Sequence, residues 1–151
     1  MVKAAGPALA GRVLELGAGT GSFTRVLLRS GVSPEHLTVV EFDPVFAARL
    51  RRRFPEVEVL EVDAFSQQAI DTLGSFDAVL SGLPLLNFPR EKSAGLIRGL
   101  LAKASAGAPF VQFTYGPREP VPPPAGVATT RIGRIWRNLP PATVWAYRLR
   151  P

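Results

Sequence analysis

An apolar stretch followed at once by closely spaced glycines is the feature that most constrains the fold of this chain. Residues 12–16 read RVLEL, which is typical of a strand buried in a sheet. Gly17, Gly19 and Gly21 follow directly, and residues 22–29 (SFTRVLLR) have the apolar spacing of a helix. Glycine is needed where the backbone turns sharply against a ligand, because a Cβ would be in the way. This order predicts an α/β domain with a ligand-binding loop.

Two further strands end on carboxylates. Residues 37–41 (LTVVE) are apolar and β-rich and end at Glu41, about 20 residues after the last glycine of the turn, the spacing expected for an acidic residue at the next strand end. Residues 57–62 alternate as a strand and lead into Asp63. A carboxylate such as Glu41 can accept hydrogen bonds from both hydroxyls of a ribose. Ligands bind at the carboxyl ends of strands in such sheets, so we expect these groups to converge.

The rest of the pattern predicts one Rossmann-like, doubly wound domain over residues 1–151, with a mostly parallel sheet, one reversed edge strand and a C-terminal antiparallel hairpin. We expect Ser22 to cap the first helix, with Phe23, Val26 and Leu27 on its core side, and Asp43 to cap the second. The expected helices cover residues 22–30, 44–54, 67–73 and 90–106. The expected strands cover residues 12–16, 37–41, 56–62, 76–80, 109–115, 126–136 and 143–149.

Composition narrows the classes of partner. The net charge of +6 favours a polyanion, either nucleic acid or an anionic membrane surface. The absence of cysteine excludes disulfides and thiolate metal sites, and the single histidine, His36, lies in a polar turn where we expect it to be exposed. We therefore expect no metal. No transmembrane run or signal peptide is evident, so a cytoplasmic location is the default expectation.

The motif E-x-G-x-G-x-G, together with Glu41 and Asp63, resembles the first motifs of the class I S-adenosylmethionine (SAM)-dependent methyltransferases. That resemblance implies SAM as the cofactor and an acidic residue, here Asp63, facing the adenine amino group. The residues that it implies for cofactor binding are Glu15, Gly17, Ala18, Gly19, Gly21, Glu41, Phe42, Asp63, Ala64, Phe65 and Ser81.

Three later segments resemble the bacterial phospholipid N-methyltransferases, which convert phosphatidylethanolamine toward phosphatidylcholine. They are SGLPLLNFP (residues 81–89), VQFTYGP (residues 111–117) and RIWRNLPPA (residues 134–142). The resemblance implies a phospholipid amine as the acceptor and an anionic membrane surface as the partner, on the inner face of the cytoplasmic membrane. It implies that the catalytic surroundings comprise Ser81, Leu83, Pro84 and Tyr115, and that the substrate is held by Tyr115, Arg134, Arg137 and Asn138.

Some of these side chains have simpler interpretations. Arg131, Arg134 and Arg137 are three residues apart and cannot share one face of a regular strand, so some of them must be solvated. We expect Trp136 and Trp145 to pack in the hairpin rather than to anchor in a membrane.

The loop after the fourth strand also leaves alternatives open. Leu85, Leu86 and Phe88 can belong to the core or form an apolar lip that meets lipid. Tyr115 can be a half-buried packing residue instead of a substrate ligand.

Two alternatives to a lipid methyltransferase remain at this stage. The early motifs are also similar to those of rRNA adenine dimethylases, and a basic protein suits RNA, although residues 81–84 (SGLP), directly after the fourth strand, lack the Asn and the aromatic residue that would stack a flipped base. The phospholipid enzymes carry an additional amphipathic helix before the first strand, and only residues 1–11 precede it here. We therefore expect that helix to be missing from this chain, and a truncated SAM-binding domain without activity is the third alternative.

Overall fold

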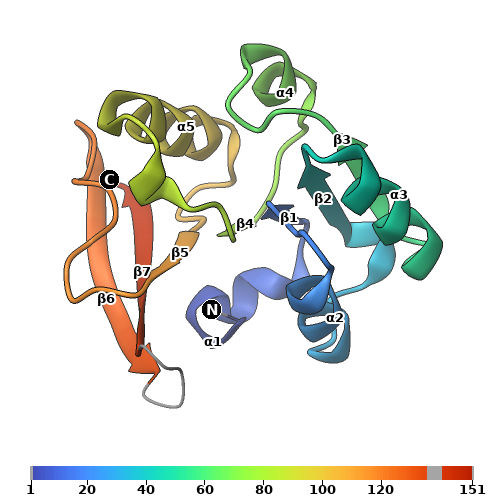
Figure 1. Cartoon of the computed structure of the whole chain (residues 1–151). Helices are drawn as coiled ribbons and strands as arrows, with labels where there is room; N and C mark the ends of the chain where they lie inside the picture. Colours follow the sequence, from blue (N-terminus) through green and yellow to red (C-terminus); the bar gives the residue numbers. More distant parts are fainter. Residues whose placement is uncertain (1, 136–140, 151) are drawn as a thin grey trace.

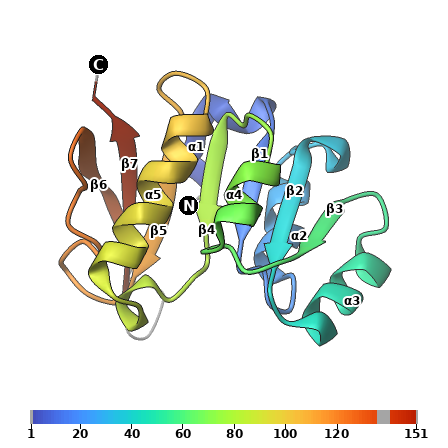
Figure 2. The same cartoon turned by 90° about the horizontal axis from the view of Figure 1, so that it is seen from above.

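In the computed structural model, which describes residues 2–135 and 141–150, helices cover both faces of a seven-stranded sheet (Figures 1 and 2). The strands are β1 (Val13–Leu16), β2 (Leu37–Glu41), β3 (Glu58–Glu61), β4 (Ala78–Ser81), β5 (Phe110–Thr114), β6 (Val127–Ile135) and β7 (Ala142–Leu149). The α-helices are α1 (Val2–Ala5), α2 (Ser22–Arg29), α3 (Pro44–Arg53), α4 (Gln67–Thr72) and α5 (Arg90–Lys103). Short 3-10 turns cover Gly6–Ala10, Pro34–His36 and Leu85–Asn87. All the predicted elements are found, and their ends differ from the predictions by at most three residues.

The order of the strands confirms the doubly wound fold and corrects one detail of it. The order is β3-β2-β1-β4-β5-β7-β6, in which β1 to β5 are parallel and β7 is antiparallel to both of its neighbours. The reversed strand was expected at the edge, but β7 lies inside the sheet and β6 forms the edge. The reason is that the segment after β5 returns to the opposite end of the sheet before β6 begins, so that β7 is the strand that meets β5 (Figure 1).

Two apolar clusters hold the layers together, one on each face of the sheet. Leu14 and Val79 pack with Leu96, Ile97 and other residues of α5 on one face. On the opposite face, residues of β1, β2 and β4 pack with α2, α3 and the N-terminal segment. β1 and β4 are buried at every position, which explains why their sequences are nearly continuous apolar runs.

The starts of α2 and α3 show what local patterns could and could not predict. Asp43 caps α3 as expected, because its Oδ1 accepts hydrogen bonds from the backbone N–H groups of Val45 and Phe46 at 2.8 and 3.1 Å. The cap of α2 is Gly21 rather than Ser22. Val26 was expected in the core but is exposed, because the buried face of this short helix is centred on Thr24 and Leu27.

The proline-rich segment between β5 and β6 is anchored on the sheet. The hydroxyl of Tyr147, on β7, donates to the Val121 carbonyl at 2.7 Å and accepts from the Val121 N–H at 3.3 Å. Burial raises the pKa of Tyr147 to about 12, so the hydroxyl stays protonated and keeps donating. This contact guides the chain from the carboxyl end of β5 back to the start of β6.

Candidate functional site

The glycine turn after β1 closes over the carboxyl edge of the sheet. The N–H of Gly17 donates to the carbonyl of Val40 at 2.9 Å, which ties the turn to β2. Gly17 has a φ of +68°, and a Cβ there would lie 2.8 Å from Cδ2 of Leu83. Gly19 also has a positive φ, of +53°, but faces open space. Gly17 therefore allows close packing of the loop after β4, whereas Gly19 leaves room on the side where a ligand can enter.

Glu41 is the last residue of β2, and its carboxylate holds the glycine turn in place through a hydrogen bond. Its Oε2 accepts from the Gly19 N–H at 2.7 Å, and its Oε1 accepts from the Asp43 N–H at 2.9 Å. Each carboxylate oxygen can accept a second hydrogen bond, so the group is still able to receive two ribose hydroxyls as predicted.

Glu15 lies beneath the turn and lines neither of the two cavities described below. It is only 1% exposed, and within the described part of the chain its Oε2 has no hydrogen-bond partner. Burial raises the pKa of this carboxyl from 4.5 to about 7, a hydrogen bond from Thr24 lowers it, and the nearby Glu41 adds slightly to the rise. This position suits a role for Glu15 as a buried support of the glycine turn.

A cavity of about 340 Å³ opens between the ends of β1, β2 and β3. Its lining joins two carboxylates to apolar side chains: Gly17, Val40, Glu41, Phe42, Val62, Asp63, Ala64, Phe65, Leu83, Phe88 and Lys92. We call it the cofactor cavity. An adenosine group fits this chemistry, because aliphatic and aromatic side chains can enclose a purine while carboxylates accept from hydroxyl and amino groups.

Phe88 and Lys92 contribute to this cavity although the sequence did not single them out for it. The rings of Phe65 and Phe88 lie 4.4 Å apart, centre to centre, and the Lys92 ammonium lies 4.8 Å and 5.8 Å from their centres. Both residues come from the loop and helix that follow β4, far along the chain from the cofactor motifs. The phenylalanine of the segment SGLPLLNFP was the one available signal.

A second cavity, of about 480 Å³, lies between the ends of β4 and β5. It is lined by Gly82, Leu83, Pro84, Leu85, Leu86, Asn87, Gln112, Phe113, Thr114, Tyr115, Gly116 and Pro120. We call it the acceptor cavity. Leu83 lines both cavities, and so marks the place where contents of the two can meet.

Some of the predicted catalytic residues line the acceptor cavity, and one lies behind its lining. Leu83, Pro84 and Tyr115 line it, whereas Ser81 is fully buried and lines neither cavity. The Ser81 hydroxyl instead accepts from the Leu83 N–H at 3.3 Å. Tyr115 is 58% exposed at the mouth, with its ring edge-on to Phe113, which makes it more open than a half-buried packing residue.

The loop after β4 splits between core and surface. Leu85 is buried, Leu86 is 66% exposed, and Phe88 is partly buried against Phe65. Only Leu86 therefore forms the apolar lip that was one of the two expectations for this segment.

A β-bulge changes the expectation for the arginines of β6. The pairing of β6 with β7 shifts between Arg131 and Gly133, so Arg131 lies opposite Trp145 and Arg134 opposite Thr143. Trp145 and Thr143 are two residues apart and share a face, and opposite residues in antiparallel strands share a face as well. Arg131 and Arg134 therefore lie on one face, contrary to the expectation for a regular strand. Of the other predicted residues here, Trp145 is buried as expected, and Trp136, Arg137 and Asn138 lie outside the described residues.

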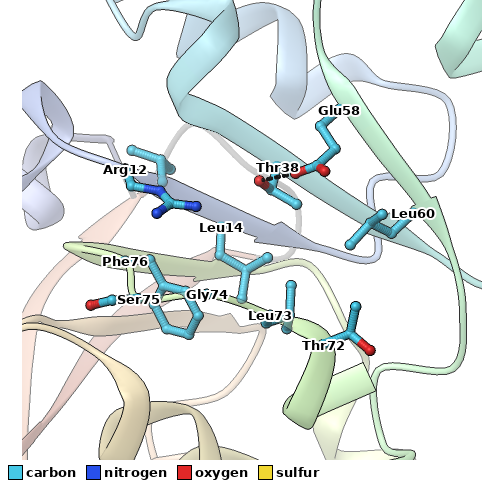
Figure 3. Close-up of a pocket in the computed structure, with 11 residues that line it drawn as sticks. Arg12, Leu14, Thr38, Glu58, Leu60, Thr72, Leu73, Gly74, Ser75 and Phe76 are labelled. Carbon is cyan, nitrogen blue, oxygen red and sulfur yellow. Dashed lines mark hydrogen bonds between the residues drawn. The ribbon is translucent and has the colours of Figure 1, made fainter. Parts of the chain in front are cut away.

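A third cavity, of about 140 Å³, lies at the opposite, amino-terminal edge of the sheet (Figure 3). Arg12, Gly74 and Phe76 line it, and Thr38 donates to Glu58 there at 2.8 Å. None of the predicted site residues that the structure describes lines this cavity. The candidate site is therefore the pair of cavities at the carboxyl edge.

The strand order, the glycine turn and the acidic strand ends define the class I methyltransferase fold. The sequence profile of the methyltransferase domain family matches residues 13–104, and the chain belongs to that family. SAM is accordingly the cofactor, and the carboxylates and apolar side chains of the cofactor cavity suit the chemistry of its adenosine group.

Relatives and solved structures agree on this class. The chain is 36% identical to the ornithine lipid N-methyltransferase of Singulisphaera acidiphila over 115 residues, which cover 70% of this chain and 58% of that protein. It is 46% identical to ribosomal RNA small subunit methyltransferase A of Bordetella pertussis over 68 residues, 44% of this chain and 24% of that protein. The chain thus spans less than two thirds of the length of either relative.

Two solved structures share the fold at low identity. Magnesium protoporphyrin IX methyltransferase from Synechocystis PCC 6803, solved with SAM, superposes with a TM-score of 0.69 at 16% identity, over 97% of this chain and 74% of that one. TrmN from Thermus thermophilus gives 0.75 at 17% identity, over 99% of this chain and 47% of that one.

Proposed function

We propose that this domain methylates the amine nitrogen of an amine-bearing membrane lipid, such as phosphatidylethanolamine or an ornithine lipid. The observation that carries the proposal is the acceptor cavity, which is lined mainly by apolar residues and opens beside the exposed Leu86 and Tyr115. A lipid headgroup can enter such a mouth while its apolar part stays outside. The likeness to an ornithine lipid N-methyltransferase supports the same class of acceptor.

The chain's own task is positioning rather than covalent catalysis. When bound, SAM supplies an already activated methyl group. The residues must hold an amine in line with that methyl group at close range, an effect worth several kcal/mol in general. Leu83, at the junction of the two cavities, and the glycine turn that it packs against define the passage.

The amine must also arrive without its extra proton, because an ammonium has no lone pair to donate and its pKa is near 10. The apolar lining of the acceptor cavity lowers the pKa of a cation that enters it by desolvation. In the lining, the Asn87 amide oxygen can accept a hydrogen bond from the amine, and the Tyr115 hydroxyl can take the proton of the ammonium as it gives its own proton to water.

Arginine side chains are suited to the anionic part of the headgroup. Arg131 and Arg134 share one face of β6 because of the bulge. Arg134 lies opposite Thr143 of β7, and Thr143 lies opposite Thr114 of β5, which lines the acceptor cavity. Guanidinium groups match the oxygens of phosphate or carboxylate. We assign the headgroup anion to this pair, with Arg137 and Asn138 as further predicted ligands.

The membrane itself is the proposed partner, approached from the carboxyl edge of the sheet. Four exposed side chains stand at this edge: Phe42, Val45, Leu86 and Tyr115, which we call the apolar rim. None of the helices within the described residues has the length and apolar character to cross a bilayer. With a net charge of +6, the domain is suited to peripheral binding at the anionic inner face of the cytoplasmic membrane.

RNA is the second candidate acceptor, favoured by the likeness to ribosomal RNA small subunit methyltransferase A of Bordetella pertussis. That match covers 44% of this chain. A domain that binds SAM without transferring its methyl group is the third possibility.

The experiment that tests the proposal follows labelled methyl from SAM into lipid and RNA in parallel. Vesicles contain phosphatidylglycerol with either phosphatidylethanolamine or ornithine lipid, and the RNA arm contains total rRNA at the same salt concentration. We expect label in lipid, lost in Glu41→Ala and retained in Glu61→Ala, because Glu61 also ends a strand but lies outside both cavities. Label in RNA alone, or SAM binding by calorimetry without transfer to either acceptor, contradicts the proposal.

A further inference from the structure

Gln112 is a buried polar side chain at the acceptor cavity that the proposed function leaves without a role. It lies on β5, opposite Ser81 of β4 on one side and Trp145 of β7 on the other. It is 2% exposed and lines the cavity. A buried amide costs stability unless it is hydrogen-bonded, so its partners indicate what it does.

The partners of Gln112 fix the orientation of its amide. Nε2 donates to the carbonyl oxygen of Leu83 at 3.0 Å and to that of Phe113 at 2.9 Å. Both partners are acceptors, so only the amide nitrogen can face them. Oε1 points away from them and, among the residues described, has no hydrogen-bond partner.

The first of these partners, Leu83, is the residue that both cavities share. Its N–H is held by Ser81, and its carbonyl also accepts from the Leu85 N–H at 2.9 Å. The first contact comes from the last residue of β4, directly before the loop, and the second comes from within the loop. Gln112 comes from the neighbouring strand β5, and so ties the loop to the sheet at a second strand.

We propose that Gln112 is a positioning residue for methyl transfer. Its amide holds the Leu83 backbone at the junction of the two cavities and thereby sets the alignment of the acceptor nitrogen with the methyl group. The inference deepens the proposed function and rests on transfer through this junction. A displacement of about 1 Å at such a place can lower a rate about a hundredfold, even when both ligands still bind.

The test compares two variants that remove the donor in different ways. Gln112→Met keeps the length of the side chain without a donor, and Gln112→Glu turns a carboxylate oxygen toward two carbonyl oxygens. We expect kcat, normalised to the fraction of protein that binds SAM, to fall roughly tenfold to a hundredfold in Gln112→Met and further in Gln112→Glu. The SAM dissociation constant should change less than about threefold, because Glu41, Asp63 and the glycine turn are intact.

Gln67→Met is the matched control, since Gln67 is an exposed glutamine on α4 outside both cavities. It should leave kcat unchanged. A purely structural role for Gln112 would lower the melting temperature without lowering the normalised kcat, and that result overturns the inference. A parallel loss of SAM affinity overturns it as well, because it would place Gln112 in cofactor binding.

The assay uses whichever acceptor the wild-type protein methylates, so the two proposals fail separately. Label in RNA would end the lipid proposal and still leave the Gln112 comparison valid. Crystal structures of the wild type and of Gln112→Met provide a test that needs no acceptor. We expect Leu83 to be displaced in the variant, and an unmoved Leu83 overturns the inference.

Discussion

The cofactor cavity and the acceptor cavity share Leu83, yet they are assembled from different kinds of contact. The cofactor cavity depends on residues near the ends of consecutive strands, with Glu41 linking two neighbouring loops through hydrogen bonds of 2.7 and 2.9 Å. The acceptor cavity joins the loop after β4 to β5 through Gln112, and Tyr115, Gly116 and Pro120, which follow β5, complete its lining. The first is built around the ends of consecutive strands, with side chains added from the segment after β4, whereas the second depends on how β5 is placed beside the loop after β4.

The largest expected effect is a loss of activity, caused by a substitution at the junction of the two cavities. Gly17→Ala places a methyl group 2.8 Å from Cδ2 of Leu83 at a φ of +68°. We expect kcat/KM to fall by at least about a hundredfold, because Leu83 must move in both cavities. Gly31→Ala has the same kind of backbone strain, at a φ of +95°, with nothing near its added methyl group. If both variants lose activity equally, backbone strain alone is responsible and Leu83 does not couple the cavities.

The difference between the cofactor cavity and the acceptor cavity explains which features of the site could be predicted from the sequence. Glu41, Asp63 and the cap at Asp43 were identifiable because each depends on spacing along one or two elements. Gln112 was not, because its role arises only when β5 is placed beside the loop after β4. The internal position of β7 and the shared face of Arg131 and Arg134 were also missed. A strand order set by a returning segment and a one-residue bulge leave no periodic signal in the chain.

The second prediction concerns the buried support of the cofactor cavity. The pKa of Glu15 is about 7 in the folded protein, against an ordinary value of 4.5. The folded state therefore binds the proton more tightly, and stability should fall as pH rises from 4.5 to 7 and level off above. The full change is about 3 kcal/mol in the free energy of unfolding.

Urea unfolding of the wild type and of Glu15→Gln across this pH range tests the effect. Glutamine has no proton to lose, so the variant should lack this slope and be the more stable protein at pH 8. Identical slopes for the two proteins would show that Glu15 does not titrate in this range.

The third prediction tests whether Arg131 and Arg134 bind the headgroup anion of a lipid acceptor. Arg131→Ala and Arg134→Ala should each raise KM for a lipid acceptor about tenfold, because each removes a charged donor to the headgroup anion. The SAM dissociation constant should not change. Arg29→Ala, on the exposed end of α2, removes the same charge elsewhere and controls for general attraction to the membrane. An equal effect of all three substitutions would mean that only net charge matters.

The smallest effect is expected at the apolar rim, where the acceptor side meets the membrane. Leu86→Ser should weaken binding to phosphatidylglycerol vesicles about threefold. The leucine is 66% exposed in the free protein, and only this exposed part of one side chain can be withdrawn from water when the membrane binds. Val26→Ser is the control, since Val26 is 46% exposed on α2 and outside the rim. Co-sedimentation measures both. If the two variants bind equally well, the carboxyl edge is not the membrane surface, and the acceptor must reach its cavity from solution or from RNA.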